Sequence, residues 1–171
     1  MVFIDGSNFH HGVLDYCGKS DSCLDHHKLS VAIANNRKLI RAYYYTARII
    51  NDGTPKAAHL EKTQQRLISK LNRTPYLEVR YGRMTKVGGT YSQKGVDTAI
   101  AVDMIMMAVK DLYDVAVLIS ADSDLAEAVQ GVKSLGKHVE LGLFSKQKAF
   151  ELRNVCDVDL TLDPYIDPLL P

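Results

Sequence analysis

The chain is poor in cysteine and has no long apolar run. Its three cysteines, Cys17, Cys23 and Cys156, are odd in number and form no CxxC pair. This argues against a disulfide framework and for a reducing compartment, so we expect a cytoplasmic protein. No apolar stretch approaches the length that a membrane span requires, and Asp5 interrupts the start too early for a signal peptide. We therefore expect no association with a membrane.

Internal repeats, low-complexity segments and convincing linkers are also absent. The 171 residues are expected to form a single domain, 1–171, that ends in a proline-rich tail at 163–171. The net charge of +1 is unevenly distributed: residues 56–94 contain nine basic and two acidic side chains, whereas residues 97–127 contain seven acidic side chains and one lysine. Such an asymmetry indicates either two solvated faces or a basic surface beside an acidic site.

Apolar segments alternate with helical patterns along the chain. Continuous apolar strands separated by helices predict a parallel sheet that is covered on both faces. In such sheets, ligands bind at the carboxyl ends of the strands, where the strand order reverses. Residues 85–95 (TKVGGTYSQKG) are expected to form a flexible loop. The expected strands are 2–4, 39–50, 76–84, 115–119, 139–144 and 158–162, and the expected helices are about 7–16, 25–35, 57–72, 96–109, 123–135 and 146–154.

Two of these strands end in carboxylates. The first runs into DGSN, which begins with Asp5, and the strand 115–119 runs into SADSD, which contains Asp122 and Asp124. A helix N-cap would explain Asp122 alone, but it explains neither Asp124 nor the similar ending at Asp5. Carboxylates crowded at one edge of a sheet destabilise the fold unless a cation or a substrate offsets their charge.

A third acidic segment is KGVDTAIAVDM. Its first aspartate, Asp97, falls in the first turn of the predicted helix, where a negative charge is favourable by itself. Asp103 lies six residues further along the chain and does not share the helix face of Asp97. A salt bridge or a solvated position would also explain an aspartate there.

Three segments in this order, FIDGSN, KGVDTAIAVDM and SADSDLAEAVQGVKSLGKHVELG, resemble the NYN domains of the LabA-like group, a branch of the PIN-like nuclease superfamily. The resemblance covers nearly the whole chain, and the combination is more specific than any one motif. It implies a Rossmann-like, three-layer α/β/α sandwich with a central, mostly parallel sheet. It also implies an acidic cluster that binds Mg²⁺ or Mn²⁺ and hydrolyses phosphodiester bonds in RNA.

The resemblance can be carried over position by position. At Leu125 many members have an aromatic residue, and we expect that position to lie in the core. Mg²⁺ and Mn²⁺ prefer oxygen ligands, which the aspartates supply. The expected catalytic and metal-binding residues are Asp5, Asp97, Asp122 and Asp124; Ser7, Asn8 and Ser120 are expected to hydrogen-bond to these carboxylates or to the substrate, and Asp103 matches a further acidic position whose role the resemblance leaves open.

The expected function is therefore that of a metal-dependent ribonuclease that prefers single-stranded RNA. The alternative is a catalytically weak or inactive RNA-binding or regulatory module that retains the acidic pocket. A phosphohydrolase with an aspartate nucleophile would need a second aspartate that DGSN lacks. Whether the chain forms a homo-oligomer stays open. The basic residues expected to guide the RNA backbone are Arg66, Lys70, Arg83, Lys86 and Lys94.

A cluster of cysteine and histidine suggests a zinc site as another alternative. Structural zinc sites favour closer cysteine pairs and separated histidines, and two adjacent histidines on a helix point in different directions. Ordinary thiols and imidazoles are therefore the preferred interpretation. The residues concerned are Cys17, Cys23, His26 and His27, with His10 and His11 nearby.

Overall fold

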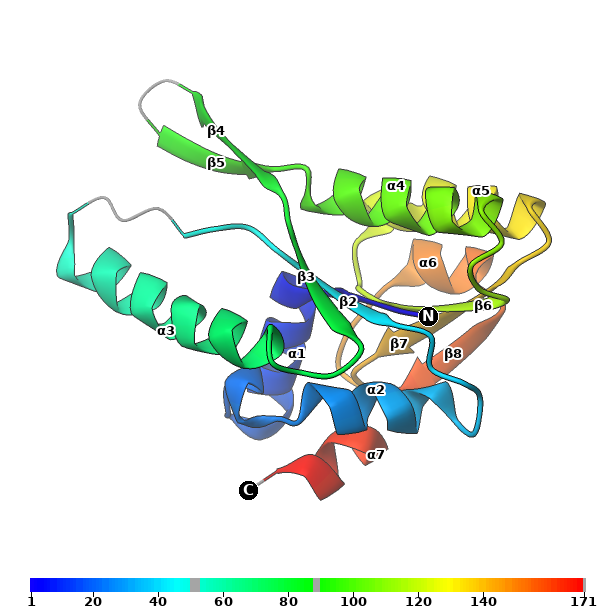
Figure 1. The fold of residues 1–171 in the computed structure, drawn as a ribbon, viewed down its shortest axis with the longest axis horizontal. Helices are drawn as coiled ribbons and strands as arrows, with labels where there is room; N and C mark the ends of the chain where they lie inside the picture. The colour runs from blue at the N-terminus through cyan, green and yellow to red at the C-terminus, as the bar shows by residue number, and fades with distance from the viewer. Residues whose placement is uncertain (50–52, 88–89, 171) are drawn as a thin grey trace.

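The structure, a computed structural model, describes residues 1–49, 53–87 and 90–170, with the backbone alone at 56 and within 83–94. A six-stranded parallel sheet lies at its centre with helices on both faces (Figure 1). This architecture confirms the predicted α/β/α sandwich. The strands of the sheet are β1 (Val2–Asp5), β2 (Ala42–Thr46), β3 (Leu77–Tyr81), β6 (Val115–Ile119), β7 (His138–Leu143) and β8 (Val158–Thr161).

The strand order is β3-β2-β1-β6-β7-β8. The chain first adds β2 and β3 on one side of β1. It then crosses to the other side of β1 and adds β6, β7 and β8. This is the doubly wound order, and its reversal point lies between β1 and β6. Ile4 of β1 lies opposite Tyr44 of β2 and Ile119 of β6. The two strand ends that carry aspartates are thus neighbours in the sheet.

Successive side chains of each strand enter two different cores. Phe3 belongs to a core beneath one layer of helices, whereas Val2 and Ile4 belong to the core beneath the other layer. This alternation follows from the period of two along a strand. One layer contains α4 (Val96–Val109), α5 (Ala126–Ser134) and α6 (Phe150–Val155), and the other contains α1 (Gly6–Cys17), α2 (His26–Ala34), α3 (Pro55–Leu71) and α7 (Asp163–Ile166).

Residues 83–94 differ from the prediction. We expected a strand to about 84 and then a flexible loop, but the chain forms an antiparallel pair, β4 (Arg83–Val87) with β5 (Thr90–Lys94). This pair projects away from the main sheet (Figure 1). The sequence contains Gly-Gly between two runs of strand-forming residues, a pattern typical of a hairpin, which explains the difference. Similarly, the predicted helix 123–135 begins with a separate 3₁₀ turn, η2 (Ser123–Leu125), before α5.

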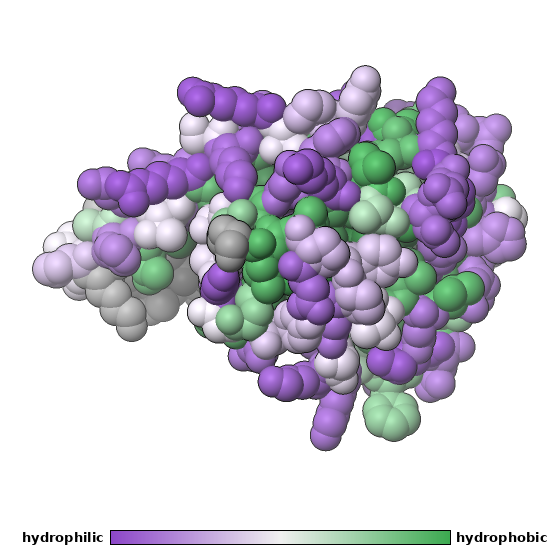
Figure 2. All heavy atoms as spheres, turned by 90° about the horizontal axis from the view of Figure 1, so that it is seen from below, coloured by the Kyte–Doolittle hydropathy of each residue, from purple (hydrophilic) through white to green (hydrophobic). Residues whose placement is uncertain are grey.

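The segment predicted as a tail packs against the domain as far as it is described. It contains α7 and the short turn η3 (Asp167–Leu169), and Ile166 is fully buried. The face that carries α2 and α7 shows hydrophobic residues interspersed with hydrophilic ones (Figure 2). Among the described residues, no helix combines the length and apolar character needed to cross a membrane.

Candidate active site

Asp5 ends β1 and caps α1 with the same carboxylate. Its Oδ1 accepts hydrogen bonds from the backbone N–H groups of Ser7 and Asn8, both at 3.1 Å. These are donors that a helix start leaves without partners inside the helix, which explains why a buried strand can end on an acid. Gly6 follows because the chain passes close to β2, where an added Cβ would lie 2.6 Å from the carbonyl oxygen of Tyr45.

The other oxygen of Asp5 links β1 to the loop after β6. Asp5 Oδ2 accepts from Asn8 Nδ2 at 2.6 Å and from Ser120 Oγ at 3.0 Å. Asn8 Oδ1 in turn accepts from the backbone N–H of Ala121 at 3.3 Å. Asp5 is only 2% exposed. The two strand ends at the reversal point are therefore joined by side chains that the sequence had singled out.

Asp122 caps the 3₁₀ turn η2. Its Oδ1 accepts from the backbone N–H of Asp124 at 3.0 Å, and its own N–H donates to Ser120 Oγ at 3.1 Å. The N-cap role considered from the sequence is therefore real, and Asp122 Oδ2 has no hydrogen-bond partner among the described residues. Asp124 is exposed on the turn.

Asp97 connects α4 electrostatically to this cluster. It lies in the first turn of the helix and is partly buried. Burial raises its pKa, and the negative charges of Asp122, Asp5 and Asp124 raise it further. Asp97 is therefore close enough to the other three predicted aspartates to be repelled by them, although the four come from three separate segments.

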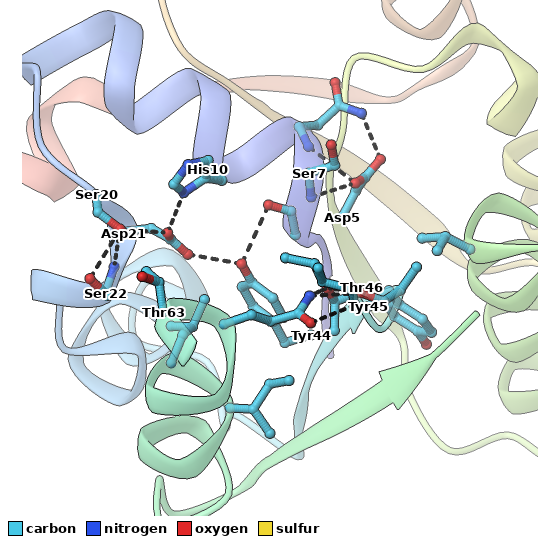
Figure 3. A pocket seen from close by; sticks show the side chains of 18 of the residues that line it. Asp5, Ser7, His10, Ser20, Asp21, Ser22, Tyr44, Tyr45, Thr46 and Thr63 are labelled. Atoms are coloured by element: carbon cyan, nitrogen blue, oxygen red, sulfur yellow. Dashed lines mark hydrogen bonds and ion pairs between the residues drawn. The ribbon is translucent and has the colours of Figure 1, made fainter. Parts of the chain in front are cut away.

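Three of these aspartates line one pocket of about 410 Å³, namely Asp5, Asp97 and Asp122. Residues of β2 and one side of α3 form other walls of the pocket, and Figure 3 shows Asp5 beside Tyr45 and Thr46 there. The pocket lies at the carboxyl end of the parallel sheet, where the doubly wound topology favours ligand binding.

The chemistry of this donor set fits a hard divalent cation. Carboxylate oxygens are the ligands that Mg²⁺ and Mn²⁺ prefer, and a cation would relieve the repulsion that raises the pKa of Asp97. Within the described part of the chain, however, no group of three or more His, Cys, Asp or Glu side chains is arranged closely enough to hold a metal ion. The fit therefore rests on the type of ligand and on charge.

Asp103 lies elsewhere on α4 and has protein partners. The Tyr45 hydroxyl donates to Asp103 Oδ2 at 2.9 Å, and Arg80 Nε lies 3.7 Å from the same oxygen. Lys70 also has a local role, because its Nζ donates to the carbonyl oxygens of Ser22 and Leu24, each at 2.8 Å.

The other basic residues expected to bind RNA are only partly visible. Arg66 is exposed on α3. Arg83, Lys86 and Lys94 lie on the β4–β5 pair, and their side chains fall outside the described part of the structure.

Several polar residues of the pocket were not predicted to be part of it. His10, Ser20, Asp21 and Ser22 line the same space as the aspartates. The sequence relates His10 only to a possible zinc site, and Asp21 lies outside the three segments that resemble the NYN domains. The surrounding Ser-Asp-Ser sequence looks like an exposed turn, so nothing local indicated that Asp21 would be fully buried.

Comparisons with known proteins agree with the fold. The family profile described as "NYN domain" matches residues 1–163. The chain is also similar to the crystal structure of a protein of unknown function, VPA0982, from Vibrio parahaemolyticus RIMD 2210633, with a TM-score of 0.67 and 16% sequence identity over 96% of this chain and 92% of that chain. At this identity the likeness concerns the fold alone. A search among curated proteins found no match.

Proposed function

The chain belongs to the NYN domain family, whose members are generally nucleases, and from that premise we propose that it is a metal-dependent endoribonuclease of the LabA-like group. The observation that carries the proposal is the convergence of Asp5, Asp97 and Asp122 on one pocket at the reversal point of the sheet. The substrate is single-stranded RNA, and the protein acts in the cytoplasm.

Each aspartate has a distinct task. Asp97 and Asp122, which line the pocket, would hold Mg²⁺ or Mn²⁺ with their carboxylate oxygens, and exposed Asp124 would add negative charge beside them. Asp5 supplies a fixed charge, because four hydrogen bonds hold its two oxygens. When bound, the ion supplies a water that loses its proton more easily and offsets the charge of the scissile phosphate.

Neighbouring residues position these groups and the substrate. Asn8 and Ser120 fix the carboxylate of Asp5, and the backbone N–H of Ser7 contributes to the same arrangement. The exposed guanidinium of Arg66 lies on α3, the helix that forms one wall of the pocket, so it attracts the phosphate backbone. The side chains of the β4–β5 pair are proposed to extend this attraction.

Cleavage of labelled single-stranded RNA in Mn²⁺, in Mg²⁺ and in a chelator tests the proposal. We expect cleavage only with metal, and a loss of about 100-fold or more in Asp97→Asn and Asp122→Asn, since each substitution keeps shape but removes a ligand charge. Asp114→Asn is the matched control, because Asp114 lies just before β6 at the opposite end of the strand and is exposed.

Two outcomes would contradict the proposal. Undiminished cleavage by purified Asp97→Asn and Asp122→Asn would show that the aspartates are not the catalytic site. RNA binding by the wild type without cleavage in either metal would favour the alternative of a binding module that retains the acidic pocket. One structural observation favours this alternative: among the described residues, no three acidic side chains lie in an arrangement that could hold a metal ion.

A further inference from the structure

A histidine–aspartate pair shares the pocket with the acidic cluster but has no part in the function proposed above. His10 Nδ1 lies 2.7 Å from Asp21 Oδ1, and the Tyr44 hydroxyl donates to Asp21 Oδ2 at 2.8 Å (Figure 3). Asp21 is fully buried. Each of its oxygens has a partner within the protein, so this carboxylate orients the imidazole instead of serving as a free ligand.

The segment that carries Asp21 is held in place on two sides. Ser20 caps the 3₁₀ turn η1 (Asp21–Cys23), and its Oγ accepts from the N–H and the hydroxyl of Ser22, at 3.3 Å and 3.0 Å. Lys70 of α3 binds the carbonyl oxygens of Ser22 and Leu24. The partner of His10 therefore belongs to a turn that is tied to the wall of the pocket.

His10 itself is accessible from the pocket. Its side chain is 40% exposed and lines the same space as the three aspartates. Nδ1 is engaged by Asp21, and Nε2 has no hydrogen-bond partner among the described residues, so Nε2 can donate to a ligand. The hydrogen bond with Asp21 raises the pKa of His10, which outweighs the opposing effect of burial. The imidazole thus retains its positive charge at a higher pH than an ordinary histidine does.

We propose that His10, through Nε2, forms a subsite for the RNA phosphate adjacent to the scissile one. The inference rests on the proposed function, which places the scissile phosphate at the aspartates. A protonated imidazole donates from both ring nitrogens, so Nε2 suits an anion while Nδ1 stays with Asp21, and a protonated histidine cannot ligate a metal. Figure 3 shows Asp5 and His10 on different sides of one pocket, so a bound backbone passes from the acidic cluster to His10.

The subsite predicts that His10 acts only on substrates with a second phosphate. We compare a dinucleoside monophosphate with a trinucleoside diphosphate as substrates in Mn²⁺. His10→Ala should raise KM for the two-phosphate substrate about tenfold, because one charge-assisted hydrogen bond is lost. The value of kcat should change little. It should leave the one-phosphate substrate unchanged. The salt dependence of binding to a longer single strand should become shallower by about 0.7.

His11→Ala is the matched control, because His11 is the exposed neighbour on the same helix and lies outside the pocket lining. His10→Gln keeps a donor without the charge and should fall between wild type and alanine. Equal losses on both substrates, or no loss on either, would overturn the subsite.

A failed nuclease assay does not decide the subsite. If the wild type cleaves neither substrate, the proposed function fails. Binding of the intact trinucleoside diphosphate to wild type and to His10→Ala, both in Mn²⁺, then judges the subsite by itself. Equal affinities in the two proteins would reject it.

Discussion

Two buried aspartates of this protein show how burial and hydrogen bonding oppose each other at a carboxyl group. Burial alone would raise the pKa of Asp21, but its contacts with His10, His26 and Tyr44 outweigh that effect and hold the pKa well below the usual range. Asp5 is also buried and receives four hydrogen bonds. Asp21 therefore remains charged inside the fold at neutral pH because donors surround it, and Asp5 shows the same supply of donors at a second buried carboxyl group.

The His10–Asp21 pair should make stability depend on pH. The pKa of His10 is raised in the folded state, so its contribution is fully present below the pKa of an unfolded histidine, about 6.5, and is lost as the pH rises through the folded pKa. Asp21, with its lowered pKa, stays ionised throughout this window. We expect the melting temperature of the wild type to decline over this range more steeply than that of Asp21→Asn.

Thermal unfolding at a series of pH values measures this difference. His26 also contacts Asp21, with Nε2 3.7 Å from Oδ2, so the comparison reports on the contacts of Asp21 with both imidazoles. His11→Ala should keep the slope of the wild type, because His11 does not contact Asp21. Parallel curves for wild type and Asp21→Asn would mean that the pair contributes no pH-dependent stability.

At the scale of the elements, helix α1 is confined by its neighbours. Gly12 lies in the middle of α1, where an added Cβ would lie 2.6 Å from Cε2 of Phe144. Gly131 lies in α5, where the nearest atom to an added Cβ is Cδ1 of Ile105 at 3.4 Å, an ordinary contact. The two helical glycines therefore differ in the space around them.

This difference predicts opposite effects of one substitution. Gly12→Ala should lower the free energy of unfolding by about 1–3 kcal/mol, because overpacking against the ring exceeds the gain in helix propensity. Gly131→Ala should raise the free energy of unfolding by up to about 1 kcal/mol, because alanine favours a helix more than glycine does and its methyl group would make only an ordinary contact. Urea denaturation of both variants checks the pair, and a stabilised Gly12→Ala would show that Phe144 moves aside at little cost.

Elements with a local signal were predictable, and contacts between distant segments were not. The apolar runs at β1 and β6, each followed by an acid, predicted both the strands and their meeting at the reversal point. The β4–β5 pair also has a local signal, the Gly-Gly between its strands, but the same glycines are equally typical of a flexible loop. The burial of Asp21 had none, because it depends on His10 and Tyr44 from other elements.

At the scale of the whole molecule, folding gathers aspartates that the unfolded chain keeps apart. Asp5 ends β1, Asp97 lies in the first turn of α4, and Asp122 caps the turn η2 after β6, so the three meet only when the sheet forms. The raised pKa of Asp97 means that the folded state binds its proton more tightly than the unfolded state does. Above the folded pKa, ionised Asp97 therefore lowers the stability of the protein.

A divalent ion that binds the folded state alone should reverse this penalty. At 100 times its dissociation constant such an ion contributes about 2.7 kcal/mol, and each kcal/mol shifts the melting temperature of a domain of this size by roughly 2–4 °C. Mn²⁺ should thus raise the melting temperature of the wild type by several degrees over a chelator control. Asp97→Asn should shrink that rise and, in the chelator, should melt above the wild type at neutral pH, because one repelling charge is gone.

The two effects of Asp97→Asn separate a metal site from a cluster of unrelated acids. Asp114→Asn removes a charge from the opposite end of β6, so it should keep the full response to Mn²⁺. A general effect of net charge would instead change the response of the melting temperature to Mn²⁺ by the same amount in both variants. A wild-type melting curve that is indifferent to saturating Mn²⁺ and Mg²⁺, in protein shown to be metal-free, would argue that the aspartates repel one another without holding an ion.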